Sequence, residues 1–434
     1  MATAVHRGLA PLKKGLRSGA TVIAQHTTTH RAVTIHVSVA AGSGHDADSA
    51  LGTAHFVAKV IDRGTESHST DALAEAFDGR GVSLSVSVSR HLMTFTCTCL
   101  AEDVEAVLDL VAGVITAPTF PPAQVELRRS SVITSLRQDE DSPAVVATEA
   151  LMSSLYPGGH PYGRRAKGTV ASIQAIGRED LIAFHHTHVG ASSLRVVIVG
   201  DVEADRAVRL ADAAFGGWAH TGGAPLAPPP AAPGRTRTSQ TIALPGKVQS
   251  DIAYGFTSVT RSDPRYYALT LMNTVLGQYA MGGRLGDSIR ERQGMAYYVF
   301  SGFDANVAEG PLMVRAGVNP SNVARAIASI DEELTRMAQD GVTPSELADA
   351  KRYLIGSMPR MLETNGGIAG FLHSADFFGL GLDFDQRLPG LLDAVTLEDV
   401  HEVARTFLAP DRAAIVVAGP PADGVDNGAA EPPR

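Results

Sequence analysis

The amino-acid sequence has 434 residues, 44% of them hydrophobic and 19% charged, which is typical of a globular protein with sizeable cores. Its formal net charge of −9 argues against nucleic acid or an anionic membrane surface as the main partner. No segment approaches the roughly 20 consecutive apolar residues of a membrane span, and residues 1–17 contain no continuous apolar stretch of the kind found in signal peptides.

Patterns typical of strands open and close the first half of the chain. Apolar alternation predicts strands at residues 20–26 and 33–41, and a short apolar run before glycine predicts a third strand at residues 194–201. Between these strands, apolar residues at helical spacing predict helices over residues 70–81 and 103–115.

The two cysteines of the chain, Cys97 and Cys99, stand two residues apart on an apparent strand. Side chains at that spacing point to the same face of a strand. The chain therefore has no disulfide framework, and this absence favours a cytoplasmic location.

Histidines cluster in two places, and we interpret both as structural. His160–Gly163 reads HPYG and is typical of a turn. His185–His188 reads HHTH and resembles a metal site in composition alone, so we interpret it as a solvated helix face.

A stretch rich in proline, alanine and glycine divides the chain nearly in half. Residues 222–233 read GGAPLAPPPAAP and have no apolar period, so we expect a semi-rigid extended linker over residues 222–236. This linker predicts an N-terminal domain of residues 1–221 and a C-terminal domain of residues 237–434, with a disordered tail from about residue 421.

The second half repeats the order of elements in the first. Strand patterns at residues 239–245, 250–256 and 412–420 enclose helical patterns such as residues 322–341. Strands and helices come in separate groups, which indicates an α+β fold and not alternating βαβ units. The repeated order indicates a duplicated domain of about 200 residues.

The segment around His55 gives the first indication of function. Residues 52–55 read GTAH, and Gly64-Thr65 follows. This frame resembles that of the pitrilysin-like (inverted-zincin, insulinase) metallopeptidases, whose motif is H-x-x-E-H on a helix. Residues i and i+4 lie on one helix face, so two histidines of that motif hold one Zn²⁺. The glutamate takes a proton from the metal-bound water.

The chemistry of that motif is missing here. Residues 55–59 read HFVAK, so Ala58 stands at the position of the general base and Lys59 at the position of the second histidine. The resemblance places Ser135 at the position of the third ligand, a glutamate in the family. A lone histidine binds zinc weakly, because structural zinc sites need four ligands. We therefore expect no metal in this chain and interpret His55 as retained for packing or hydrogen bonding.

The second half carries a segment that resembles the family's second-domain element. Residues 282–305 contain an arginine and, seven residues later, a tyrosine: Arg290 and Tyr297. In the family this pair lies opposite the zinc. The resemblance implies that Arg290 donates to peptide carbonyls and that Tyr297 donates to the oxygen of the tetrahedral intermediate. In the alternative interpretation Asp287 pairs with Arg290 along one helix, and Tyr297 belongs to the core.

The resemblance covers most of residues 10–420 and implies the family's fold. That fold has two homologous domains, each a mainly antiparallel β-sheet covered by helices on one side. A chain with the Arg/Tyr pair but without H-x-x-E-H completes an active site only with a partner. We therefore predict a non-catalytic, substrate-binding subunit of a heterodimeric zinc-dependent peptidase that acts on peptides or unfolded segments. The homologous partner would carry H-x-x-E-H and the zinc.

Two alternatives stay open at this point. The first is a purely structural member of the peptidase fold with no role in proteolysis, which the Arg290/Tyr297 pair argues against. The second is a self-sufficient metallopeptidase with other ligands, which Ala58, Lys59 and Ser135 together disfavour.

Overall fold

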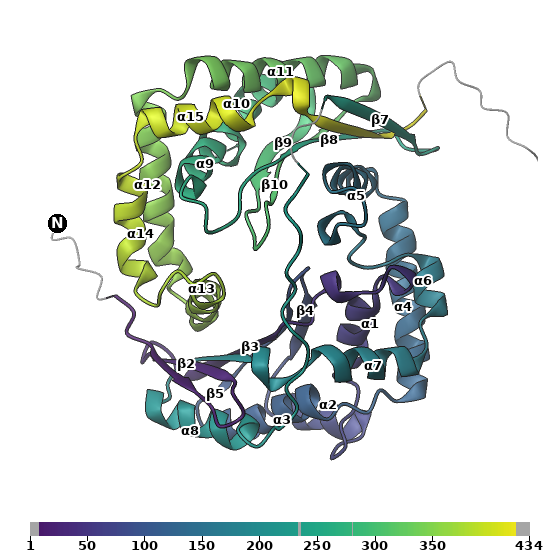
Figure 1. Cartoon of the computed structure of the whole chain (residues 1–434), viewed down its shortest axis with the longest axis vertical. Coiled ribbons are helices and arrows are strands. Elements are labelled where there is room, and N and C mark those ends of the chain that lie inside the picture. Colours follow the sequence, from purple (N-terminus) through teal and green to yellow (C-terminus); the bar gives the residue numbers. More distant parts are fainter. Residues whose placement is uncertain (1–7, 233–235, 280, 422–434) are drawn as a thin grey trace, which may run out of the picture. The chain divides into compact units, whose positions relative to one another are not determined.

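The computed structural model describes residues 8–232, 236–279 and 281–421 (Figure 1). The described residues form two compact units, each built from several separate segments of the chain. Unit 1 is drawn from Met1–Arg137, Gly158–Pro229 and Arg352–Ala394. Unit 2 is drawn from Gln138–Pro157, Pro230–Lys351 and Val395–Arg434. The predicted disordered tail, which follows residue 421, lies outside the described residues.

Unit 1 contains a six-stranded sheet with the order β1-β2-β6-β3-β5-β4. Its strands are β1 (Leu12–Gly15), β2 (Thr21–His26), β3 (Ala32–Val39), β4 (Ser85–Val88), β5 (Met93–Leu100) and β6 (Arg195–Gly200). Among the described strands of this sheet, β2 and β6 pair in parallel and the other neighbours pair antiparallel. Ile35 of β3 stands opposite Cys97 of β5 and Ile198 of β6, which fixes the register of the sheet centre.

One face of this sheet packs against helices from the first half of the chain. These helices are α1 (Thr53–Val60), α2 (Thr70–Asp78), α3 (Val104–Thr116), α6 (Val170–Ala175), α7 (Arg178–His188) and α8 (Ala204–Phe215). Side chains alternate along a strand, and Val33, Ile35 and Val37 of β3 enter the core on this face. Phe56 of α1 and Phe215 of α8 belong to the same core and are fully buried. Full burial of such a side chain contributes roughly 1.5–3 kcal/mol.

The opposite face of the sheet is covered by α13 (Asn365–Phe377), which comes from the second half of the chain (Figure 1). Polar contacts attach this helix to β3. The Asn365 amide donates to the carbonyl of Ala32 at 2.9 Å, and His373 Nε2 lies 2.7 Å from Ser38 Oγ. The helix α14 (Phe384–Asp393) follows it within unit 1.

Unit 2 contains a five-stranded sheet with the order β7-β11-β8-β10-β9. Its strands are β7 (Thr238–Ala243), β8 (Ser250–Thr257), β9 (Ala296–Phe303), β10 (Pro311–Val318) and β11 (Ala414–Gly419). Of the described pairs, β7 and β11 are parallel and the others antiparallel. Its own helices are α9 (Tyr266–Asn273), α10 (Gly283–Leu285), α11 (Val323–Asp340), α15 (Leu397–Phe407) and the π-helical segments η5 (Thr274–Gln278) and η6 (Gly286–Arg292).

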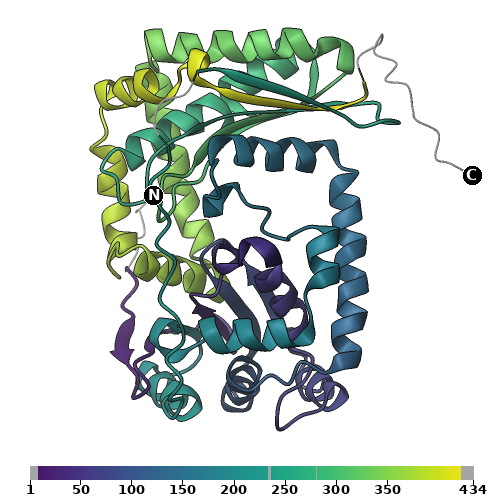
Figure 2. The same ribbon diagram turned by 45° about the vertical axis from the view of Figure 1, so that its right-hand side comes forward.

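A helix from the first half of the chain covers one face of this second sheet. Figure 2 shows the sheet between α11, in green, and α5 (Pro143–Leu155), in blue. Gly255 in the middle of β8 makes this contact possible, because a Cβ at that position would come within 3.0 Å of Leu151 and 3.3 Å of Leu155. The glycine therefore lets α5 approach the backbone of the strand closely.

The α+β fold with two mainly antiparallel sheets is confirmed. The sequence led us to expect helices on one side of each sheet. In each unit, one side of the sheet carries helices from the half of the chain that supplies the strands. The other side carries a helix from the opposite half, α13 in unit 1 and α5 in unit 2. The units are therefore not the contiguous segments 1–221 and 237–434. Helical periodicity identifies the apolar face of α5 or α13, but it does not identify the sheet that receives that face. The helices α4 (Pro122–Glu140) and α12 (Pro344–Met361) each contribute residues to both units.

The cysteines lie on one strand face, as the sequence predicts. Cys97 and Cys99 are buried free thiols on one face of β5, and burial raises their pKa values to about 12 and about 11. Residues 222–232 contain no helix or strand. His160 Nε2 lies 2.9 Å from the Pro229 carbonyl within unit 1, so this part of the linker is bonded to the fold. No described helix has the length and apolar character needed to cross a bilayer.

The histidine that holds α13 against β3 makes the fold sensitive to acid. The pKa of His373 is lowered to about 3, mainly by burial and further by the positive charge of His36 and Arg195, while Asp376 opposes the shift. The unfolded chain has a histidine pKa of about 6.5. Between these two values the unfolded state binds more protons than the folded state. The stability due to neutral His373 is therefore fully present above pH 6.5 and is lost as the pH falls toward 3.

We predict that His373→Gln reduces the acid sensitivity of folding. Between pH 7.5 and pH 5 the wild-type chain should lose about 2 kcal/mol of unfolding free energy through this residue. Glutamine keeps a hydrogen-bonding group for Ser38 but does not titrate. Between the same two pH values the variant should therefore lose about 2 kcal/mol less unfolding free energy than the wild type. Urea denaturation followed by circular dichroism at both pH values measures the difference. His30→Gln, at an exposed position, is the control. Equal pH sensitivity in His373→Gln and the wild type would contradict the prediction.

Candidate functional site

The helix α1, which carries His55, is held at its N-terminus by a buried carboxylate. Asp46 accepts hydrogen bonds from the backbone N–H groups of Gly52 at 2.8 Å and Ala54 at 2.9 Å. The first N–H groups of a helix have no partner within the helix, so this carboxylate satisfies donors that would otherwise be buried unpaired. Burial raises the pKa of Asp46 to about 7, although these hydrogen bonds and Arg164 oppose the rise.

The glycines that frame α1 are required by backbone geometry. Gly52 has a φ of +91°, and a Cβ there would lie 2.5 Å from the carbonyl oxygen of Lys167. Gly64 has a φ of +149°, and a Cβ there would lie 3.0 Å from Thr119 Oγ1. Residues with a side chain rarely adopt such φ values. The frame around the motif therefore has a structural reason to persist that is independent of any metal.

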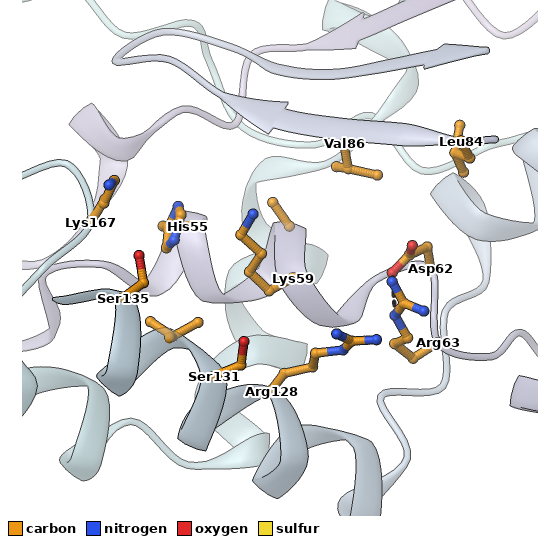
Figure 3. Close-up of a pocket in the computed structure, with 12 residues that line it drawn as sticks. His55, Lys59, Asp62, Arg63, Leu84, Val86, Arg128, Ser131, Ser135 and Lys167 are labelled. Atoms are coloured by element: carbon orange, nitrogen blue, oxygen red, sulfur yellow. Dashed lines mark ion pairs between the residues drawn. The ribbon is translucent and has the colours of Figure 1, made fainter. Parts of the chain in front are cut away.

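A cavity of about 470 Å³ lies in unit 1 between α1, α4 and β4, which is an edge strand of the sheet (Figure 3). Its walls come from the exposed face of α1, from one face of α4, and from the start of β4. The lining residues are His55, Ala58, Lys59, Asp62, Arg63, Leu84, Val86, Arg128, Ser131, Val132, Ser135 and Lys167.

All four positions that the sequence identified as the altered metal motif line this cavity. His55, Ala58 and Lys59 come from α1, and Ser135 faces them from α4 (Figure 3). Ser135 thus lies in the same cavity as the altered motif, and its correspondence to the third ligand position stays a prediction. The roles of these residues in the present chain stay predictions.

The residues of the cavity do not fit a zinc ion. The ammonium of Lys59, the methyl group of Ala58 and the hydroxyl of Ser135 stand at the positions where the resemblance leads us to expect a histidine, a glutamate and a glutamate. Zn²⁺ binds deprotonated nitrogen, sulfur and carboxylate ligands, and a fixed positive charge beside it is repulsive. Among the described residues no group of three His, Cys, Asp or Glu side chains is arranged to hold a metal ion.

The cavity is instead rich in positive charge. Lys59, Arg63, Arg128 and Lys167 line it together with a single carboxylate, Asp62. The Arg63 guanidinium lies 2.9 Å from the Asp62 carboxylate. Burial raises the pKa of Asp62, and the charges of Arg63, Arg128 and Lys59 oppose that rise. No local sequence motif reveals this cluster, because its cations come from separate segments of the chain.

Arg290 lies in unit 2 on the π-helical segment η6. π-Helical turns are rare and occur often at functional sites. The predicted alternative pairing with Asp287 is wrong, because Asp287 pairs with Arg292 at 2.9 Å. The Arg290 guanidinium lies 3.6 Å from its neighbour Glu291 and is about one-third exposed. Arg290 also lines an open cavity of about 470 Å³, whose other lining residues are Gly277, Gln278, Met281, Gly282 and residues 298–302.

Tyr297 is the second residue of β9, the edge strand of the second sheet, and is 82% exposed. The alternative interpretation of Tyr297 as a core residue is therefore wrong. The next residue, Tyr298, points to the other side of the strand, donates its hydroxyl proton to Asp251, and lines the cavity that contains Arg290. The structure thus places Arg290 and Tyr298 in one cavity, and Tyr297 on the adjoining surface.

The two histidine segments are structural, but the second is less solvated than expected. His160 begins a turn, accepts from the N–H of Tyr162 at 3.0 Å, and is buried. His185 Nε2 lies 2.8 Å from the carbonyl of Ile115, and burial lowers the pKa of His185. His188 is half-buried beside Phe184, so this end of α7 is partly packed and not a fully solvated face.

Comparisons with known proteins give a consistent family assignment. Residues 21–167 match the family model described as insulinase (peptidase family M16), and residues 175–354 match the one described as peptidase M16 inactive domain. A Mycobacterium leprae protein named as an uncharacterized zinc protease is 29% identical, over 91% of this chain and 88% of its own. The mitochondrial-processing peptidase subunit beta of Bos taurus is 24% identical, over 94% of this chain and 83% of its own.

Solved structures agree with that assignment. The crystal structure described as a peptidase M16 inactive domain from Pseudomonas fluorescens has a TM-score of 0.88 and 26% sequence identity to this chain. The match covers 95% of this chain and 98% of that one. The similarity therefore extends over both units and is not restricted to the segment around His55.

We predict that Asp46→Ala destabilises the fold by about 2 kcal/mol, because two buried N–H groups at the start of α1 lose their acceptor. Chemical denaturation at pH 6 measures the change. Asp48→Ala is the matched control. Asp48 pairs with Arg164 at 3.0 Å, but its side chain is 78% exposed, so its loss should cost less than about 0.5 kcal/mol. A loss no larger in Asp46→Ala than in Asp48→Ala would show that the buried carboxylate does not hold α1.

Proposed function

The chain belongs to peptidase family M16, and we propose that it is the non-catalytic, substrate-binding subunit of a heterodimeric zinc-dependent peptidase. The resemblance to the pitrilysin-like enzymes is confirmed at the level of the family. One observation carries the proposal beyond the family. The Lys59 ammonium, the Ala58 methyl group and the Ser135 hydroxyl line one cavity, at the positions that the resemblance assigns to the metal motif.

Hydrolysis by this chain alone lacks both of its chemical requirements. No side chain at position 58 can take a proton from water, and the cation at position 59 opposes the entry of Zn²⁺. The catalytic zinc of the complex is therefore assigned to a homologous partner with an intact H-x-x-E-H motif. One relative is named as a subunit of the mitochondrial-processing peptidase, which supports an assembly of more than one chain.

The surfaces that remain suit peptide binding. β4 is an edge strand, and it adjoins the cavity of unit 1 through Leu84 and Val86. An extended peptide can add to such an edge through its main-chain hydrogen bonds, with pockets for alternate side chains. In unit 2, the exposed Tyr297 and the partly exposed Arg290 supply donors near the edge strand β9. We assign these donors to the peptide carbonyls and to the oxyanion formed on the partner's zinc side.

We propose a cytoplasmic location for the complex. The free buried thiols of Cys97 and Cys99 are compatible with a reducing compartment. The substrates are peptides or unfolded segments, because these can adopt the extended conformation that a sheet edge requires.

We predict that the purified chain carries less than stoichiometric zinc and cleaves no peptide. The physical reason is the loss of the base at Ala58 and the positive charge at Lys59. Elemental analysis and a quenched-fluorescence peptide library measure the two properties. One equivalent of zinc together with cleavage that a chelator abolishes would contradict the proposal and favour a self-sufficient metallopeptidase.

We predict that a mixture of this chain with its partner has peptidase activity that neither has alone. Tyr297→Phe removes one hydroxyl and little volume, so kcat should fall by about 10²–10³-fold with a small change in KM. Arg290→Ala should also raise KM, because the guanidinium donates to the bound backbone in the ground state as well. Steady-state kinetics of the reconstituted pair measure these effects, and size-exclusion chromatography checks assembly.

Two further variants sharpen that experiment. Arg292→Ala is the matched control for Arg290→Ala, since Arg292 lies on the same segment and pairs with Asp287. Tyr298→Phe removes the neighbouring hydroxyl. If Tyr298→Phe lowers kcat and Tyr297→Phe does not, the oxyanion role belongs to the other tyrosine. Full activity in both Tyr297→Phe and Arg290→Ala would leave the chain as a structural scaffold.

A further inference from the structure

The cavity of unit 1 contains more positive charge than its own residues neutralise. Asp62 is the one carboxylate in its lining, and it lies within the field of Arg63, Arg128 and Lys59. No hydrogen bond or ion pair joins the Lys59 ammonium to any of the described residues, and the same holds for the Arg128 guanidinium. Lys59 and Arg128 therefore contribute positive charge to the lining without a direct ion pair among the described residues.

Buried polar atoms in this cavity also have unused hydrogen-bonding capacity. Arg128 Nε and Arg63 Nε are buried without a hydrogen-bond acceptor among the described residues. Asp62 Oδ1 is close to the Arg63 guanidinium, at 2.9 Å, but the two are not aligned as a hydrogen bond. Buried donors are nearly always satisfied in native proteins, and an unsatisfied one calls for an explanation such as a bound ion. Arg63 Nε already faces Asp62, so Arg128 Nε is the buried cationic donor that is left without a partner, and such a donor favours an anion.

The cavity also has apolar lining. Leu84 and Val86 line it from the side of the sheet (Figure 3), and Val132 lines it from α4. Ser131 and Ser135 add hydroxyl groups on the same face of α4 as Val132. The occupant that fits this lining carries an anionic oxygen group beside an aliphatic group. A free phosphate or sulfate has no part that would use the apolar wall.

We propose that this cavity binds the C-terminal carboxylate of a peptide whose last residue is aliphatic. The carboxylate lies against Lys59 and Arg128, and the aliphatic side chain lies against Leu84 and Val86. The adjoining edge of β4 receives the preceding peptide backbone. The choice of a peptide as the carrier of the carboxylate rests on the proposed function, whereas the anion preference rests on the cavity alone. In this site the positive charge serves to bind a peptide end and not to activate water.

Fluorescence anisotropy with the full chain at low ionic strength tests the proposal. The first probe is an N-terminally labelled Gly-Ser-Gly-Ser-Ala-Leu peptide with a free carboxylate. The second is its C-terminal amide, and the third is an amide in which Glu replaces the Ala. We expect the free acid to bind at least about tenfold more tightly than either amide, as for other hydrogen bonds to charged groups. Added salt should weaken the binding of the free acid.

Variants locate the binding in the cavity. Lys59→Gln combined with Arg128→Gln should weaken binding of the free acid by about tenfold or more and leave the amides unchanged. Arg137→Gln is the control for Arg128→Gln, because it removes one arginine charge from an exposed position of α4 outside the cavity. It should change the affinity less than about twofold. Circular dichroism checks that each variant is folded.

Several results would overturn the proposal. Equal affinity for the free acid and its amide excludes a carboxylate site, and so does a double variant that retains the preference. If the free acid and the Glu-containing amide bind with equal affinity, the ligand is an acidic side chain and not the end of a peptide. If inorganic phosphate binds and no peptide does, the cavity is a site for an inorganic anion only. None of these measurements uses the partner, so loss of the carboxylate site and loss of the partner's activity are separate outcomes.

Discussion

The need to satisfy the first backbone N–H groups of α1 determines the geometry of the cavity in unit 1. Asp46 supplies the acceptors, and Gly52 allows the turn that brings these groups to the carboxylate. Once α1 is held at this end, its exposed face presents His55 and Lys59 to α4 and β4. None of these constraints involves a metal. A helix that holds zinc in family enzymes therefore keeps its position after the ligands are gone, because its packing and its capping are structural requirements of the fold.

The exchange of helices between the two halves of the chain is the second constraint on the fold. α13 covers the face of β3 that carries Ser38, and α5 covers the face of β8 that contains Gly255. Each sheet has two faces to remove from water, and the helices of its own half cover one of them. Burial of the second face therefore requires a helix from elsewhere in the chain. Unit 1 therefore needs residues 352–394 from the second half of the chain, and unit 2 needs residues 138–157 from the first half.

Local patterns in the sequence predict the strands and helices well, and they predict the unit composition poorly. The strand at residues 33–41 is recognisable because Val33, Ile35 and Val37 alternate with polar residues. The destination of α13 is not recognisable, because Asn365 and His373 are polar residues whose partners are more than 300 positions away. The same limit applies to the site. His55, Ala58 and Lys59 stand together in the sequence, whereas Arg63, Arg128 and Lys167 become neighbours only when three segments fold onto one cavity.

The substitution at position 59 changes the chemistry of the cavity without removing its positive charge. A bound Zn²⁺ polarises a carbonyl oxygen and lowers the pKa of water, and an ammonium can do neither to a comparable extent. An ammonium still attracts anionic oxygen, and Arg128 adds donors in a planar arrangement that matches a carboxylate. The aliphatic wall formed by Leu84 and Val86 is unaffected by the loss of the metal ligands. A cavity of this kind retains what is needed to hold the end of a peptide and loses what is needed to cut one. The proposed division of labour between a binding chain and a cutting chain rests on that difference in chemistry.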